Sequence, residues 1–300
     1  MAPFAPFALH IGASISWSSF TVHWSTVIGL AVLAALYEWR ARSVRPISSM
    51  TGENEILATT AESRLTGHEP RRAFFYSGLA VIFLSLNGWL HDLSDWYLFS
   101  AHMVQHLLLT LLVPPLLIAG TPGWMLRPAL RYAPVATIAR FLTNPKVCFA
   151  TFSLVLIAWH VPALYNTAMA RHDIHVLQHL MFMASSVMLW WPVMSRVPEL
   201  PRLSYPMQML YLFLTTLPMS VVAVYITYSS NLLYPAYAAA PRILGILPLE
   251  DQLIGGLIMW IPGGLLFFGV ISLIFFRWQA RGDDSVAGAQ VDWRSAGGSR

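Results

Sequence analysis

Two copies of one histidine motif are the residues of this sequence best suited to do chemistry. The pattern His-x-x-Gln-His occurs at His102–His106 and again at His175–His179, each time at the start of a long apolar run. Residues four apart lie on one face of a helix, about 6 Å apart, so each motif presents two imidazoles side by side. Ionisable groups inside a membrane are costly and usually mark a site or a pathway. The two pairs therefore predict a shared metal or cofactor site.

The composition is typical of an integral membrane protein. Of 300 residues, 56% are hydrophobic and only 11% are charged, whereas about 25% are charged in an average soluble domain. Backbone groups in lipid must bond within their own segment, so long apolar runs predict helices. Seven runs approach the roughly 20 residues that cross the hydrocarbon core. They are Thr21–Trp39, Ala73–His91, Ala101–Ala119, Val147–His160, Ile174–Val193, Met207–Ser229 and Leu253–Phe276.

We therefore expect an all-α integral membrane protein with seven transmembrane helices in one membrane domain, residues 21–277. Residues 1–20 would form an outer N-terminal segment. Residues 40–72, between the first two spans, would form a polar cytoplasmic loop. The Gly/Ser-rich residues 278–300 predict a disordered cytoplasmic tail. The N-terminus lacks the basic region of a cleaved signal peptide, so we expect the first span to be retained.

The basic residues predict the orientation. All Lys and Arg residues except Arg171 and Arg242 fall in segments on one side of the predicted membrane or after the last span. Because basic segments stay in the cytoplasm, the N-terminus should lie outside and the C-terminus inside. The formal charge of +4 then reflects membrane anchoring, and no nucleic-acid partner is required.

This orientation places every histidine except His68 near the outer ends of the spans. His91 ends the second span and His160 ends the fourth, and one of the two motifs follows each of them. Spans two–three and four–five therefore look like two parallel helical hairpins. Asp251 and Gln252 lie at the outer mouth of the last span. The hairpins would bring six histidines toward one cavity: His91, His102, His106, His160, His175 and His179.

Imidazole beside a carboxylate and thioethers suits copper, because Met favours Cu(I) and imidazole accepts both oxidation states. Zinc fits His and Asp alone, so the motif does not choose between the two metals. We interpret Met183 and Met259 as packing residues. Cys148 is the only cysteine and lies at the opposite membrane face, which excludes a disulfide or thiolate cluster within the chain. The primary metal ligands expected are His102, His106, His175 and His179, with His91, His160 and Asp251 as further candidates.

Two other classes of function remain open at this point. A b-type haem cytochrome would use one histidine from each of spans three and five as axial ligands. A metal or small-solute transporter would explain the prolines within the spans and the parallel repeat. Against the second alternative, the inner halves of the spans carry almost no ionisable residues.

Several motifs also resemble a known family. The stretch His102–Leu109, followed by Pro114-Pro115 and Gly120-Thr-Pro122, resembles the membrane cytochrome c oxidase assembly factor CtaG of the caa-type oxidases. The run from Asp251 to Gly264 is similar to that family's last-helix motif. The resemblance covers roughly residues 20–280. It implies a multi-pass, non-enzymatic protein of the bacterial inner (plasma) membrane that handles copper for a haem–copper oxidase. Its partners would be an oxidase subunit and the lipid bilayer, and a homo-oligomer is left open.

Overall fold

The computed structural model describes residues 20–43 and 68–296, with side chains placed for residues 20–43 and 71–281. Every long regular element in these residues is a helix and none is a strand, which confirms the all-α prediction. Residues 1–19 of the predicted N-terminal segment and most of the predicted cytoplasmic loop lie outside the described residues, as do His10 and the side chain of His68.

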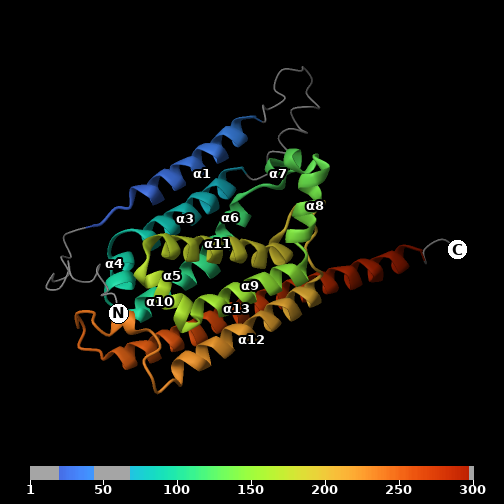
Figure 1. Ribbon diagram of the computed structural model, residues 1–300. Coiled ribbons are helices and arrows are strands. Elements are labelled where there is room, and N and C mark those ends of the chain that lie inside the picture. Colours follow the sequence, from blue (N-terminus) through green and yellow to red (C-terminus); the bar gives the residue numbers. More distant parts are fainter. Residues whose placement is uncertain (1–19, 44–67, 297–300) are drawn as a thin grey trace.

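The helices form an elongated bundle in which α12 packs along α13, and α3 packs against α6 (Figure 1). The helix α13 continues past Phe276 into the segment 278–300, for which the sequence predicts a disordered tail. The elements are α1 (Trp24–Ser43), α3 (His68–Leu86), α4 (Gly88–Trp96), α5 (Phe99–Leu107), the π-helix η2 (Leu108–Leu112), α6 (Val113–Gly120), α7 (Gly123–Leu130), α8 (Ala133–Leu142), α9 (Pro145–His160), α10 (Pro162–Ala170), α11 (His172–Met194), α12 (Tyr205–Thr227), the 3-10 helix η3 (Pro235–Tyr237) and α13 (Pro248–Ala296).

Four of the described segments are long and apolar enough to cross a membrane: Phe99–Gly120, His172–Met194, Tyr205–Thr227 and Pro248–Arg281. The count rises to six if two bent pairs, α3 with α4 and α8 with α9, are each one span. The sequence predicts seven spans. The first of these, α1, is not among the candidates, because Glu38, Arg40 and Arg42 occupy its last turns.

Large apolar side chains cover the outside of the bundle. Leu154, Val221 and Leu265 are each about two-thirds exposed, on α9, α12 and α13. A soluble monomer rarely exposes contiguous apolar surface on this scale. Lipid tails are as apolar as leucine and can cover such surface at no cost. The chain is therefore a multi-pass membrane protein.

A bend at Gly88 redirects the chain between α3 and α4. The two helices meet at 44°. Gly88 has φ +64, in the left-handed region that glycine adopts without steric strain. A Cβ atom at Gly88 would also fall on the ring of Phe20. The bend ends α3 and starts a new helix that carries His91, Ser94 and Asp95. Its effect is to turn α4 toward α5.

A π-helical turn follows the first histidine motif. It occupies Leu108–Leu112, directly before Pro114. Proline has no N–H, so Pro114 cannot donate to the carbonyl of Thr110 four residues earlier. The indole N–H of Trp190 on α11 donates to that carbonyl instead, at 3.1 Å. This hydrogen bond joins α11 to the proline-interrupted span just below the histidines. Single π turns inside helices are frequent at functional sites.

Candidate metal centre

The two histidine pairs face each other across α5 and α11. Ring centroids lie 4.2 Å apart for His102 and His106, and 4.5 Å apart for His175 and His179. Between the helices, His102 lies 5.4 Å from His175, and His106 lies 5.3 Å from His179. All four side chains are buried. We call these four residues the histidine cluster. Each motif supplies one pair at helical spacing, and α11 packs against η2 and α6, which continue the α5 helix, so the pairs come together.

The described residues contain two sets of donor atoms that could hold a metal ion. The inner group is His102, His106 and His179, and the outer group is Asp95, His102 and His175. Within each group, one donor atom per residue lies within 4.8 Å of the others. His102 belongs to both groups. The cluster is thus a pair of adjoining ligand sets rather than one isolated site.

Several imidazole nitrogens in the cluster are buried without a hydrogen-bond partner among the described residues. They are both ring nitrogens of His106 and the Nε2 atoms of His175 and His179. A buried polar atom left unpaired costs roughly 1–3 kcal/mol. Structural histidines normally avoid this cost by bonding to a neighbour. The lone pairs of these unpartnered nitrogens in the cluster are therefore available to a metal ion.

Asp95 supplies the carboxylate of the outer group. Its Oδ2 atom lies 3.5 Å from Nδ1 of His175 and 3.5 Å from Nε2 of His91. Asp95 is not among the ligands predicted from the sequence. The available signal was its spacing from His91, because residues four apart share one helical face.

His91 orients this carboxylate. The amide nitrogen of Gln105 donates to the carbonyl of Ser85 at 2.7 Å and lies 3.3 Å from Nδ1 of His91. An NH2 group can only donate, so Nδ1 of His91 accepts and its proton lies on Nε2, which faces Asp95. The glutamine of the first motif therefore fixes the tautomer of His91. Gln178, its counterpart in the second motif, is fully buried, and neither of its amide atoms has a partner among the described residues.

His160 lies below the cluster, with its ring centroid 6.3 Å from that of His106. Its Nδ1 atom lies 2.7 Å from the carbonyl of Leu156. A carbonyl only accepts, so Nδ1 carries the proton and Nε2 keeps its lone pair. That Nε2 atom is buried and has no partner in the described residues. Metal-binding histidines commonly show this arrangement, in which one nitrogen bonds a carbonyl and the other faces the metal.

Asp251 is a candidate metal ligand in the sequence, but its carboxylate bonds to backbone N–H groups in the structure. Its carboxylate accepts hydrogen bonds from the backbone N–H groups of Phe99 and Ser100, at 2.6 and 3.1 Å. These are two of the free donors at the N-terminus of α5, where a negative charge is favourable. Asp251 therefore anchors α13 to the helix that carries the first motif. It belongs to neither ligand group.

Buried tyrosines hold the backbone beside the ligands. The hydroxyl of Tyr237 donates to the carbonyl of Ser94 at 2.7 Å and lies 2.9 Å from that of Tyr165. Burial raises the pKa of Tyr165 and of Tyr237 well above the ordinary value, so both hydroxyls stay protonated. Tyr234 donates to the carbonyl of His160 at 2.9 Å. These bonds fix the residue before Asp95 and the end of α9.

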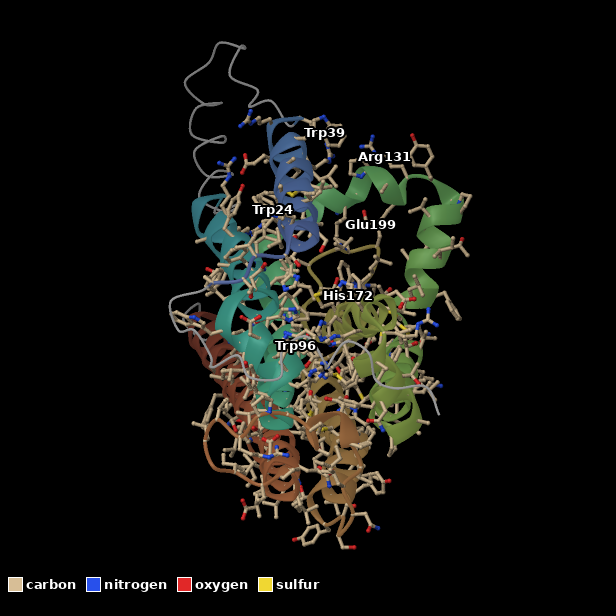
Figure 2. The ribbon with its side chains drawn as sticks, turned by 60° about the vertical axis from the view of Figure 1, so that its left-hand side comes forward. Trp24, Trp39, Trp96, Arg131, His172 and Glu199 are labelled. Carbon is tan, nitrogen blue, oxygen red and sulfur yellow. The ribbon has the colours of Figure 1, made fainter. Side chains whose placement is uncertain are left out.

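The outer end of the cluster leads toward the surface. His23, at the start of α1, is only partly buried, and its ring centroid lies 4.4 Å from that of His91. His172 is exposed, and its label lies close to that of Trp96 near the middle of Figure 2. Arg131 and Glu199 are labelled above them in the same view. A series of contacts therefore runs from the partly exposed His23 through His91 and Asp95 to His175 of the buried cluster.

Two residues considered in the sequence lie apart from the cluster. Cys148 is fully buried near the start of α9, where its Sγ lies 3.1 Å from the carbonyl of Leu142. Met183 packs in a core patch with Tyr37, Phe75 and Leu109. Both residues are packing residues in the structure, which agrees with their interpretation from the sequence.

Comparisons with known proteins identify the family to which this chain belongs. Residues 57–281 match the family model of the cytochrome c oxidase caa3 assembly factor, Caa3_CtaG. The chain is similar to uncharacterized protein Mb0105 of Mycobacterium bovis (strain ATCC BAA-935 / AF2122/97) and to uncharacterized protein MT0111 of Mycobacterium tuberculosis (strain CDC 1551 / Oshkosh). Each is 26% identical over 212 residues, which cover 63% of this chain and 31% of the relative. The chain thus spans under a third of the length of these curated relatives. No solved structure matches it. The family match covers most of the chain and confirms the resemblance seen in the motifs: the chain belongs to the cytochrome c oxidase caa3 assembly factor family.

Proposed function

We propose that this protein is a non-enzymatic biogenesis factor that binds copper in the histidine cluster and supplies it to the metal centres of a caa3-type haem–copper oxidase. The observation that carries the proposal is the convergence of His102, His106, His175 and His179 at buried positions, with several nitrogens unpaired. Family membership supports the link to oxidase assembly. The client would be an oxidase subunit that receives the metal.

Each ligand group offers three donors, which suits an open, labile metal site rather than the closed four-ligand site of a structural zinc ion. Metal–nitrogen bonds of about 2.0 Å place ligand nitrogens about 3.4 Å apart. The donor atoms of the inner group lie within 4.8 Å of one another, so modest side-chain rotations would complete the site. Because His102 is shared with the outer group, an ion could pass between the two sets by exchanging one ligand at a time. A labile position of this kind suits a protein that gives its metal away.

The proposal includes the predicted topology: seven spans counting α1, with the N-terminus outside the bacterial plasma membrane and the C-terminus in the cytoplasm. Among the described residues, Arg127, Arg131 and Arg140 lie on or between α7 and α8, at the end opposite the cluster. Positively charged segments stay on the cytoplasmic side. The cluster would then lie near the outer face, where copper for an oxidase is accessible.

The two alternatives fit the structure less well. The cavity beside His106 and His160 measures about 20 Å³, whereas sites for large organic ligands occupy roughly 300–1,000 Å³. A haem macrocycle would require the helices to separate. For transport, ionisable groups would have to continue across the membrane. Among the described residues, the buried carboxylate and imidazole side chains are those of Asp251 and six histidines, and none lies in the inner half predicted for its span.

Oxidase activity in cells tests the proposal. A variant with alanine at His102, His106, His175 and His179 should insert normally, because polar contacts between membrane helices average only about 0.6 kcal/mol. The cells should make the oxidase polypeptides but show low oxidase activity. Excess copper should restore part of it, since a higher metal concentration offsets a lost delivery step by mass action. Normal activity in the variant would contradict the proposal, and Cys148→Ser is the matched silent control.

A further inference from the structure

A cavity directly below the histidine cluster collects thioether sulfurs. Its volume is about 20 Å³, room for one water molecule or one ion. Five of its lining residues have metal-binding side chains: Met103, His106, His160, Met219 and Met259. They come from α5, α9, α12 and α13. The other lining side chains are apolar except Thr110, whose hydroxyl donates to the carbonyl of His106 at 2.6 Å.

The two imidazoles of this cavity have free nitrogens. His160 is fixed with its lone pair on Nε2, because its Nδ1 atom donates to the carbonyl of Leu156. Both nitrogens of His106 are buried without a partner in the described residues. His106 also belongs to the inner ligand group. The cavity therefore shares one ligand, His106, with the histidine cluster.

The backbone makes room for the sulfur of Met219. A Cβ atom at Gly263 on α13 would lie 3.2 Å from Cε and 3.3 Å from Sδ of Met219, closer than ordinary van der Waals contact. Any larger residue at this position would push the thioether away. Met219 and Met259 are 3% and 4% exposed. Methionine in a core usually fills irregular gaps, but these side chains surround a space that none of them fills.

We propose that this cavity is a second copper compartment that takes Cu(I) through His106, His160 and the thioethers of Met219 and Met259, with Met103 beside them. This inference rests on the proposed copper function. It adds that the thioether cavity selects Cu(I). Thioethers favour Cu(I), whereas carboxylate and imidazole together also accept Cu(II) or Zn²⁺. The carboxylate-containing outer group and the thioether cavity are thus chemically different ends of one path.

Two variants separate this compartment from the cluster above it. Met219→Leu combined with Met259→Leu removes both sulfurs at nearly constant volume, so the fold should survive. Met188→Leu, a half-buried methionine of the same core on α11 that does not line the cavity, is the matched control. Purified protein would be loaded anaerobically with Cu(I) in the presence of ascorbate and, separately, with Zn²⁺.

The measurements are the copper-edge X-ray absorption spectrum and the affinity for Cu(I) against a competing chelator. The wild type and Met188→Leu should show sulfur scattering from bound Cu(I). In the double variant this scattering should disappear and the Cu(I) affinity should fall roughly tenfold or more, while Zn²⁺ affinity stays unchanged. Wild-type Cu(I) with nitrogen ligands only, and the same affinity in the double variant, would overturn this inference but leave the proposed function standing. A wild type that binds no copper would overturn both.

Discussion

Asp95 on α4 and His175 on α11 lie close together, with Oδ2 of Asp95 3.5 Å from Nδ1 of His175. The residues are 80 positions apart in the sequence, and their approach depends on the bend that separates α4 from α3. Asp95 is the one carboxylate within either ligand group of the described residues. Asp251, the carboxylate that the sequence favoured, is occupied at the N-terminus of α5. The two carboxylates should therefore respond differently to mutation.

Asp95→Ala should weaken metal binding by about 10–100-fold, because the outer group loses its only charged donor. Its effect on unfolding should be small. Asp251→Ala should do the reverse: it removes the acceptor for two backbone N–H groups and should cost roughly 1–2 kcal/mol of stability. Metal titration and thermal unfolding in detergent measure the two effects. Equal loss of metal affinity in both variants would contradict these assignments.

His106→Ala and His179→Ala should each abolish most copper binding, and the double variant should be little worse than either single variant. Mutations of ligands that bind one ion have non-additive effects, whereas mutations at independent sites have additive effects. His172→Ala is the matched control, because that side chain is exposed on the same helix as His179. Losses that simply add would indicate two separate sites.

Gly88→Ala should destabilise the protein by about 1–2 kcal/mol, because alanine is strained at φ +64. It should also weaken copper binding, since the new Cβ falls on Phe20 and would displace the helix that carries His91 and Asp95. Gly264→Ala is the control: a Cβ there meets nothing within 4 Å. Calorimetry with parallel copper titration measures both quantities. Unchanged copper affinity in a destabilised Gly88→Ala protein would show that the bend serves the fold alone.

Reporter fusions test the orientation. A reporter active only outside the cytoplasm should work when fused after Asp95 and fail when fused after Arg140 or at Arg300. The physical basis is the retention of basic segments in the cytoplasm. Strong outside activity at Arg300 would contradict both the seven-span topology and the position of the cluster near the outer face.

Local periodicity predicted the parts of the site that one helix defines. The spacing of four residues within each motif places His102 beside His106, and His175 beside His179, whatever the rest of the fold does. The prediction that all six histidines converge used only the alternation of spans. The structure brings five of them into ring contact and links His91 to His175 through Asp95. Composition likewise predicted helices, because lipid leaves few alternatives.

The remaining features depend on contacts between distant segments. Asp95 reaches the cluster because Gly88 bends the chain, and no local pattern gives the direction of that bend. The role of Asp251 requires the N-terminus of α5 to lie beside the start of α13, a pairing across 152 positions. The sequence pattern does not distinguish Met259 from any other core methionine. Only the packing of α12 against α13 shows that Met219 and Met259 line the same cavity. The seventh span stays a prediction, because the charged residues in the last turns of α1 keep that helix out of the four to six candidate spans.

The copper content of the purified protein tests the central claim most directly. Wild-type protein and the variant with alanine at His102, His106, His175 and His179 would be loaded with copper, freed of loosely bound metal, and analysed for metal per chain. The account predicts stoichiometric copper in the wild type and its loss in the variant, with the helical content of both proteins unchanged. Equal copper in the two proteins, or none in the wild type, would contradict the claim that the histidine cluster is a copper site.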